Sequence, residues 1–215
     1  GLVKGYGGVP IYTEPEEVTG GDPESYARPR NSEEDVWNLI VTDLDIAIDR
    51  LPITSETGRA NKYAAAALKS RALLHAGCIA KYNQIQSFDG SARLQGIPSE
   101  KASEYFQSAY DAILILEGKY SLYKAKWAES NRNAQIENFK QLFFDEASPE
   151  NIFVRQYYYP DFVHNYDAYM VPRQLQGPDG YASMQNPTLD FVQMFDGIQK
   201  DPDGTISGLD PSGNN

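Results

Sequence analysis

Hydrophobic positions between residues 30 and 118 recur at helical spacing and predict three helices. The first begins after an N-cap at Ser32, where Asp35 provides an acidic variant of the capping box, and extends to about Arg50, because Pro52 stops it. Its apolar side chains form one stripe, made of Val36, Leu39, Ile40, Leu44, Ala47, Ile48 and Leu51. The pattern therefore predicts a helix that buries one face.

An acidic side chain falls inside this stripe. At 100° per residue, Asp43 lies among the apolar positions. A carboxylate that is ionised and alone in apolar surroundings is strongly unfavourable, so it needs a partner. We expect a structural ion pair of Asp43 with Arg71, or with Arg59 or Lys62 near the start of the next helix. A catalytic acid is the other interpretation.

The next two helices have different patterns. The second, from about Asn61 to Tyr82, is apolar nearly all round and is predicted to be central and most buried, with His75 and Cys78 packed in the core. The third begins near Ser99. Small residues beside aromatic residues in this pair are typical of tetratricopeptide-like helix pairs, although no 34-residue repeat is visible.

The remaining segments predict the domain organisation. Glycine and proline are dense in residues 1–30 and again after residue 160, which indicates irregular backbone. A fourth helix is predicted around 136–145, strand character over 151–159 and a short helix around 187–195. We therefore expect an extended entry strip over 1–30, a tetratricopeptide-like helical lobe over 31–147, and the start of an irregular ligand-binding lobe over 148–215. The predicted fold class is mostly α.

Composition excludes several functions. A net charge of -11 would repel a phosphate backbone, so no nucleic-acid partner is expected. One cysteine and two distant histidines cannot make a zinc site of thiol and imidazole ligands, and we expect no cofactor. The sequence contains no apolar stretch long enough to cross a membrane and no signal-like start.

Five segments, taken in order, resemble the SusD/RagB family of outer-membrane nutrient-binding lipoproteins. They are GYGGVPIYTEP (5–15), RNSEEDVWNLIVTDLDIAIDRLP (30–52), GRANKYAAAALKSRALLH (58–75), ENFKQLFFDEASPENIFVRQYYY (137–159) and NPTLDFVQMFDG (186–197). The resemblance implies a fold of tetratricopeptide-like helix pairs with an irregular, loop-rich lobe. It also implies a protein that binds glycans without being an enzyme and hands them to a TonB-dependent SusC-like transporter.

The resemblance further implies a location at the cell surface, lipid-anchored in the outer membrane. A complete family member begins with a lipoprotein signal and is longer than this chain, which starts without Met at Gly1. We therefore expect the chain to be an internal piece whose lipid anchor lies outside it.

Aromatic and short polar side chains are concentrated in the segment YYYPDFVHNYDAY, residues 157–169. Such a mixture suits a sugar, because pyranose C–H faces pack on aromatic rings while the hydroxyls need donors and acceptors. The candidate ligand residues are Tyr157, Tyr158, Tyr159, His164, Asn165, Tyr166, Asp167 and Tyr169, together with Trp127. The other interpretation is that these tyrosines half-bury against the helical lobe and that Trp127 is an ordinary partly buried side chain.

A weak calcium candidate lies near the end of the chain. Asp201, Asp203 and Asp210 stand at offsets like those of an EF-hand loop, but Gln199 takes the first ligand position and an Asp replaces the final Glu. A surface turn is the expected structure there.

Three alternative functions stay open. A peptide-binding member of the same family would use sheet edges or groups that capture a carboxylate. A glycoside hydrolase would need two carboxylates at a defined separation, and among thirty acidic residues some such pair is inevitable. A helical-repeat scaffold predicts that the aromatic segment is buried or covered by a protein partner.

Overall fold

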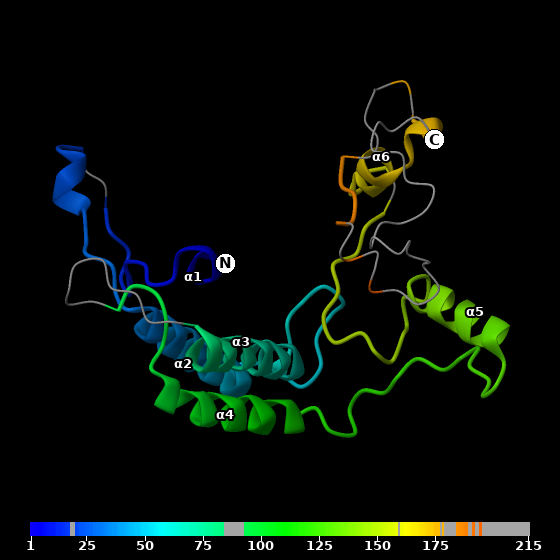
Figure 1. Cartoon of the computed structure of the whole chain (residues 1–215), viewed down its shortest axis with the longest axis horizontal. Helices are drawn as coiled ribbons and strands as arrows, with labels where there is room; N and C mark the ends of the chain where they lie inside the picture. The colour runs from blue at the N-terminus through cyan, green and yellow to red at the C-terminus, as the bar shows by residue number, and fades with distance from the viewer. Residues whose placement is uncertain are drawn as a thin grey trace, which may run out of the picture. The chain divides into compact units, whose positions relative to one another are not determined.

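The computed structural model describes residues 1–17, 20–83, 93–158, 160–176, 178, 184–188, 191 and 194. The chain divides into two compact units, Gly1–Gln156 and Tyr157–Asn215, so the break lies further along the chain than position 148. The regular structure of the described residues is helical (Figure 1). The predicted mostly α fold class is confirmed. The prediction of a strand over 151–159 is wrong for residues 151–158, which the structure describes. Tyr158 makes only an isolated bridge, with Phe162.

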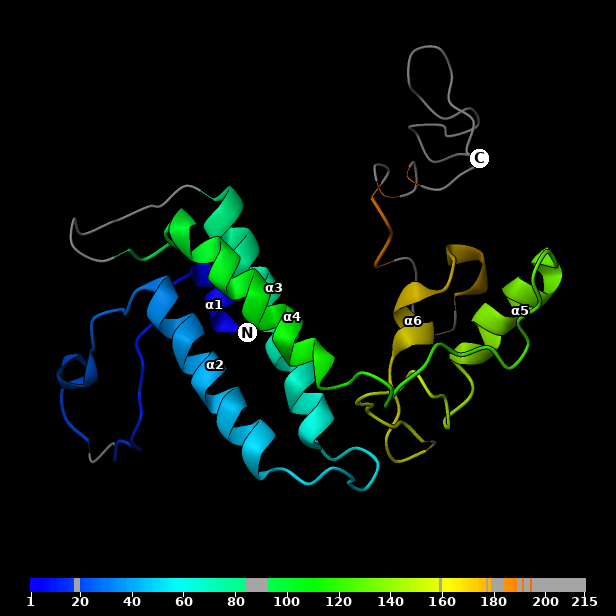
Figure 2. The same ribbon diagram turned by 90° about the horizontal axis from the view of Figure 1, so that it is seen from below.

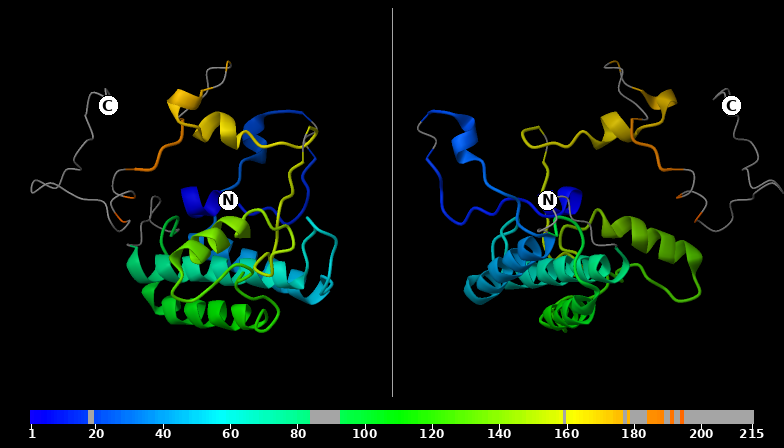
Figure 3. Two further views of the ribbon diagram at one scale, coloured as in Figure 1. Left: turned by 90° about the vertical axis from the view of Figure 1, so that its right-hand side faces the viewer. Right: turned by 60° about the vertical axis from the view of Figure 1, so that its left-hand side comes forward.

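Three helices build the core of the first unit. They are α2 (Glu33–Arg50), α3 (Lys62–Tyr82) and α4 (Ala102–Leu114), and α3 packs against both of the others (Figure 2). α3 and α4 run side by side (Figure 3). The prediction that the second helix is central is confirmed. Small buried side chains on α3 permit this close approach, namely Ala65, Ala66, Ala72, Ala76 and Ala80.

One contact between α3 and α4 has the small-residue and aromatic pattern expected of a tetratricopeptide-like pair. A Cβ atom built on Gly77 would lie 2.7 Å from ring atoms of Phe106, which is too close for any side chain. The missing side chain of Gly77 therefore makes room for the Phe106 ring between the two helices.

Helix starts follow local capping chemistry. The Ser32 hydroxyl accepts a hydrogen bond from the Asp35 N–H and the Asp35 carboxylate accepts one from the Ser32 N–H, so the predicted capping box is confirmed. The Asn61 side chain caps α3 in the same way, by accepting from the Ala64 N–H. A 3-10 helix, η2 (Ser99–Lys101), leads into α4 at the predicted position.

Other boundaries differ from the prediction. α5 spans Arg132–Leu142 because Asn131 caps it, so it begins earlier than predicted. The entry strip is not wholly extended, since it contains α1 (Leu2–Tyr6) and the 3-10 helix η1 (Pro23–Tyr26). The short elements α6 (Tyr166–Met170) and η3 (Arg173–Leu175) belong to the second unit.

The predicted ion pair of Asp43 with Arg71 is wrong, because both side chains are exposed. Trp37 is 3% exposed, so the centre of the buried face of α2 lies closer to Trp37 than the predicted stripe does. Asp43 therefore lies at the edge of the buried face instead of inside it. Arg71 lies on the face of α3 that is turned away from its packed side. A different pair, Lys69 with Asp45, joins α3 to α2 at the surface.

A tyrosine in the helical core makes stability depend on pH. Tyr105 is buried, and its hydroxyl donates to Asn38 Oδ1 at 3.0 Å. Burial, assisted by the negative charge of Glu34, raises the pKa of Tyr105 to about 12. The folded chain therefore holds this proton more tightly than the unfolded chain. Its contribution to the free energy of unfolding is complete below about pH 10 and is lost as the pH rises toward 12.

We expect Tyr105→Phe to flatten the alkaline fall in the free energy of unfolding, because phenylalanine has no proton to lose. Urea titrations at several pH values between about 9 and 11.5 measure this slope. Tyr110→Phe is the matched control, since Tyr110 is an exposed tyrosine on the same helix, and it should keep the wild-type slope. Equal slopes for wild type and Tyr105→Phe would contradict the assignment.

Candidate functional site

Five exposed rings of the second unit form a continuous row. The ring of Tyr158 lies 6.3 Å from that of Phe162, which lies 6.2 Å from that of Tyr157. The row continues from Tyr157 to His164, 5.0 Å away, and from His164 to Tyr166, 6.1 Å away. We call these five residues the aromatic row.

The backbone places the rings of the aromatic row. Tyr158 and Phe162 exchange two backbone hydrogen bonds of 2.8 and 2.9 Å, which close a tight reversal of the chain and bring both rings to one place. The Tyr166 N–H then donates to His164 Nδ1 at 3.2 Å, at the start of α6. The first contact fixes one end of the row and the second fixes the other end.

Exposure makes the aromatic row available to a ligand. Tyr158 and Tyr166, which end the row, are 61% and 60% exposed, and the rings between them are exposed as well. Tyr169 on α6 is half-buried, and the interpretation in which these tyrosines half-bury against the helical lobe stays a prediction. Stacked and edge-on rings offer apolar faces beside polar edges, which suits the C–H faces and hydroxyls of a sugar.

The structure brings together only part of the predicted set. Tyr157, Tyr158, His164 and Tyr166 are joined in the row, and Phe162 is a member that the list of candidates left out. The signal for Phe162 was present, since it stands inside the same segment. Asn165 is exposed next to the row, and its carbonyl accepts from the Tyr169 N–H. The remaining candidates, Tyr159, the Asp167 side chain and the calcium candidates Asp201, Asp203 and Asp210, lie outside the described residues.

Trp127 belongs to the first unit, in the irregular segment before α5. Its ring is 46% exposed. The buried side chain of Asn138 on α5 secures this segment, because its Oδ1 accepts from the Lys126 N–H and its Nδ2 donates to the Tyr123 carbonyl. Trp127 is thus a separate exposed platform and stays a prediction as a ligand residue.

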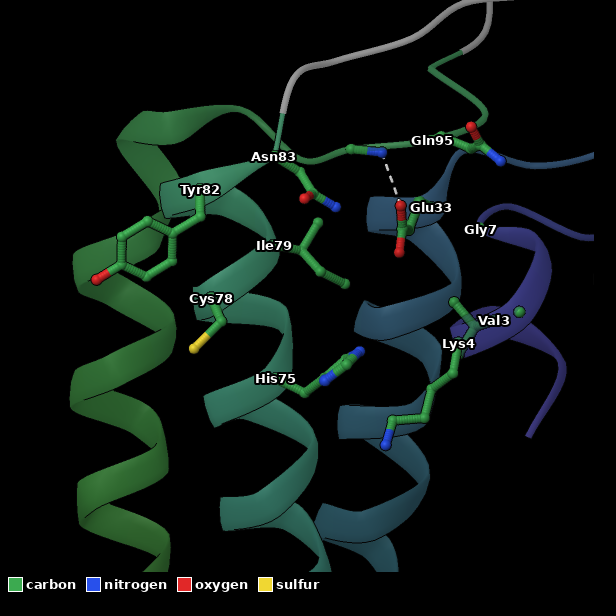
Figure 4. A pocket seen from close by; sticks show the side chains of 12 residues that line it. Val3, Lys4, Gly7, Glu33, His75, Cys78, Ile79, Tyr82, Asn83 and Gln95 are labelled. Atoms are coloured by element: carbon green, nitrogen blue, oxygen red, sulfur yellow. Dashed lines mark hydrogen bonds between the residues drawn. The ribbon is translucent and has the colours of Figure 1, made fainter. Parts of the chain in front are cut away.

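A cavity of about 570 Å³ lies between α1, the start of α2 and the second half of α3, where the sequence predicted only packed core (Figure 4). His75, Ile79 and Asn83 line it from one face of α3, at a spacing of four residues. Val3 and Lys4 line it from α1. Such a volume lies within the range of about 300–1,000 Å³ that is typical of small-molecule sites.

Two features hold this cavity open. Gly7, with a φ of 71°, ends α1, and the next N–H, that of Gly8, donates to the Leu94 carbonyl at 2.6 Å. The carboxylate of Glu33 accepts from the Gly96 N–H at 2.7 Å and from Trp37 Nε1 at 3.2 Å, so it joins the start of α2 to the 94–97 segment. Figure 4 shows the first of these bonds at one end of the cavity.

The prediction that His75 and Cys78 are packed core residues needs correction. Cys78 is exposed, and His75 is only half-buried, with its ring 5.4 Å from that of Trp37. Both line the cavity, although their side chains point in different directions (Figure 4). The spacing of four residues between His75, Ile79 and Asn83 indicates that they share one face of α3. The sequence does not show that the neighbouring helices leave this face uncovered.

Comparison with known proteins shows a likeness to a solved structure. No protein-family model matches the chain, and no curated protein matches it. The chain is similar to the crystal structure of a SusD-like protein from Bacteroides fragilis NCTC 9343, with a TM-score of 0.52 and 26% sequence identity. The likeness covers 79% of this chain and 27% of that protein. The chain has a SusD-like fold.

This SusD-like fold agrees with the tetratricopeptide-like helix pairs and the irregular second part predicted from the sequence. Membership of the RagB branch and a lipoprotein anchor stay predictions. In the part of the SusD-like chain that the structure describes, no helix is long and apolar enough to span a membrane. Within that same part, no three His, Cys, Asp or Glu side chains are grouped to hold a metal.

Proposed function

We propose that the chain is part of a SusD-like protein that binds oligosaccharides or polysaccharides at the cell surface without catalysing a reaction. In this proposal the bound glycan passes to a TonB-dependent SusC-like transporter of the outer membrane. The observation that carries the proposal is the aromatic row, from Tyr158 to Tyr166, on a SusD-like fold.

The aromatic row supports a glycan rather than a nucleotide or a metal-dependent substrate. Its members include no lysine or arginine, and the chain's net charge of -11 disfavours a phosphate ligand. Neighbouring exposed rings, some stacked and some edge-on, offer apolar surface to sugar units, each of which presents an apolar C–H face. The hydroxyls of Tyr158 and Tyr166 and the exposed amide of Asn165 supply donors and acceptors at the edges.

Tyr158→Ala and Tyr166→Ala are each expected to weaken glycan binding about twofold to tenfold, the value of one aromatic contact. The two rings occupy opposite ends of the row and share no ring contact, so the effects in the double variant should multiply. Calorimetric titration against neutral polysaccharides (α-glucan, β-glucan, xylan and mannan) and against a peptide mixture makes the measurement.

Tyr110→Ala is the matched control, because Tyr110 is an equally exposed tyrosine on α4 in the first unit. It should leave glycan binding unchanged. Binding of peptides alone would favour the peptide-binding alternative, and release of free sugar from a bound oligosaccharide over hours would favour a glycoside hydrolase. Glycan binding that the double variant leaves unaltered would remove the aromatic row as its site.

A further inference from the structure

The cavity between α1 and α3 is lined by a cationic side chain, Lys4, that has no bonded partner in the described part of the chain (Figure 4). Both oxygens of the Glu33 carboxylate are engaged, one by the Gly96 N–H and the other by Trp37 Nε1. The Lys4 ammonium makes no salt bridge or hydrogen bond with any residue that the structure describes. Glu33 is therefore already bonded, and Lys4 is the charged side chain of the cavity that is open to an anionic ligand.

The electrostatics at His75 also favour an anion beside Lys4. Burial lowers the pKa of His75, the positive charge of Lys4 lowers it further, and the negative charge of Glu33 opposes them with a smaller effect. These are the charged groups that face the imidazole from the neighbouring elements, α1 and α2. An anion placed beside Lys4 and His75 would remove the repulsion between them.

The same two walls of the cavity also offer hydroxyl-binding and apolar groups. Asn83, at the end of α3, has an exposed amide that makes no hydrogen bond elsewhere in the described part of the chain, and Figure 4 shows it on the same side of α3 as Ile79 and His75. A primary amide both donates to and accepts from hydroxyl groups. Ile79 and Val3 present apolar surface for C–H groups.

We propose that this cavity is a binding site for a small carboxylate that carries hydroxyl groups, the chemistry of a uronic acid. The carboxylate lies against Lys4 and His75, the hydroxyls bond to Asn83, and the C–H face rests on Ile79 and Val3. The site is built entirely within the first unit and does not use the aromatic row.

The first test titrates the 215-residue chain with D-glucuronate and D-galacturonate, and in parallel with D-glucose, D-galactose and acetate. Saturable binding of a uronate, at least about tenfold tighter than binding of its neutral sugar, is the expected result, because a charge-assisted bond is lost without the carboxylate. Neutral sugars that bind as tightly as uronates would overturn the proposal, and so would acetate that binds as tightly.

Two variants locate the site. Lys4→Gln is expected to weaken uronate binding about tenfold, whereas Asn83→Ala should weaken uronate binding about threefold to tenfold and leave acetate binding unchanged. Lys119→Gln is the matched control, since it removes an exposed lysine charge away from the cavity, and it should bind uronate as the wild type does. Uronate binding that Lys4→Gln leaves intact would place the ligand elsewhere and refute the site.

Histidine NMR on the unaltered chain gives an independent readout. Bound carboxylate favours the imidazolium form, so uronate should raise the pKa of His75 and should bind about threefold to tenfold more tightly at pH 5.5 than at pH 7.5. The resonances of His164, in the other unit, should not respond. An unchanged pKa of His75 in the presence of uronate would contradict the proposal, even if the variants alter uronate binding as expected.

The test of the cavity site can be distinguished from the test of the proposed glycan site at the aromatic row. The double variant of Tyr158 and Tyr166 should keep uronate binding at the cavity, and Lys4→Gln should keep binding of neutral polysaccharides at the aromatic row. Loss of uronate binding in the double tyrosine variant would assign the uronate to the row and overturn the cavity site.

Discussion

Leu73→Ala is expected to lower the free energy of unfolding by about 2–5 kcal/mol, the largest effect of any single substitution considered. Leu73 is 2% exposed on α3, inside the cluster that joins the helical core. The substitution removes apolar contacts and leaves a cavity, which the rigid helices on both sides cannot close. Urea unfolding of the variant and the wild type measures the difference.

Leu74→Ala provides the control for this prediction. It makes the same chemical change one position along the same helix, but Leu74 is 53% exposed. We expect its effect to stay within about 0.5 kcal/mol, since little apolar contact is lost. Similar losses from the two variants would mean that α3 is not packed between α2 and α4 in the orientation described.

Glu33→Ala should lower the free energy of unfolding by about 2–3 kcal/mol, because it leaves the Gly96 N–H and Trp37 Nε1 without their shared acceptor. Glu33 is 5% exposed, so the lost bonds include a charged group in a buried position. Glu33→Gln should have a smaller effect, since the amide keeps one acceptor oxygen. Chemical unfolding at neutral pH gives both values.

The variant Glu34→Ala is the control for Glu33→Ala. It shows whether the stabilisation comes from the hydrogen bonds of Glu33 or from negative charge at the start of the helix. Both glutamates lie in the first turn of α2, but the Glu34 side chain has no hydrogen bond among the described residues. Its loss is expected to cost less than about 1 kcal/mol, mainly through the helix dipole. A larger loss from Glu34→Ala than from Glu33→Ala would show that the described link to Gly96 is not the stabilising one.

Local patterns were sufficient to predict the helices of the first unit. Capping by Ser32 and Asn61 and the stop at Pro52 act within a few residues, so the sequence contains all the information needed for them. The orientation of a helix is different, because it depends on its neighbours. Asp43 was placed in the buried stripe because the weight of Trp37 on one side of α2 was underestimated.

The cavity could not be predicted for the same reason. Its anchor, the bond from the Gly96 N–H to Glu33, joins residues 63 positions apart, and no local signal indicates that pairing. In the sequence, Glu33 is only one of three acidic residues at a helix start. The aromatic segment was recognisable by composition, whereas the order of its rings follows from the bridge between Tyr158 and Phe162.

The placement of the two tryptophans gives each unit its own optical signature. Trp37 and Trp127 both belong to the first unit, and the second unit contains none. Tryptophan fluorescence therefore follows the unfolding of the helical unit alone, while tyrosine absorption includes the aromatic row. Because the Trp37 ring lies 5.4 Å from the His75 ring, and a protonated imidazole quenches a nearby indole, its emission also follows the protonation of the cavity without any added label.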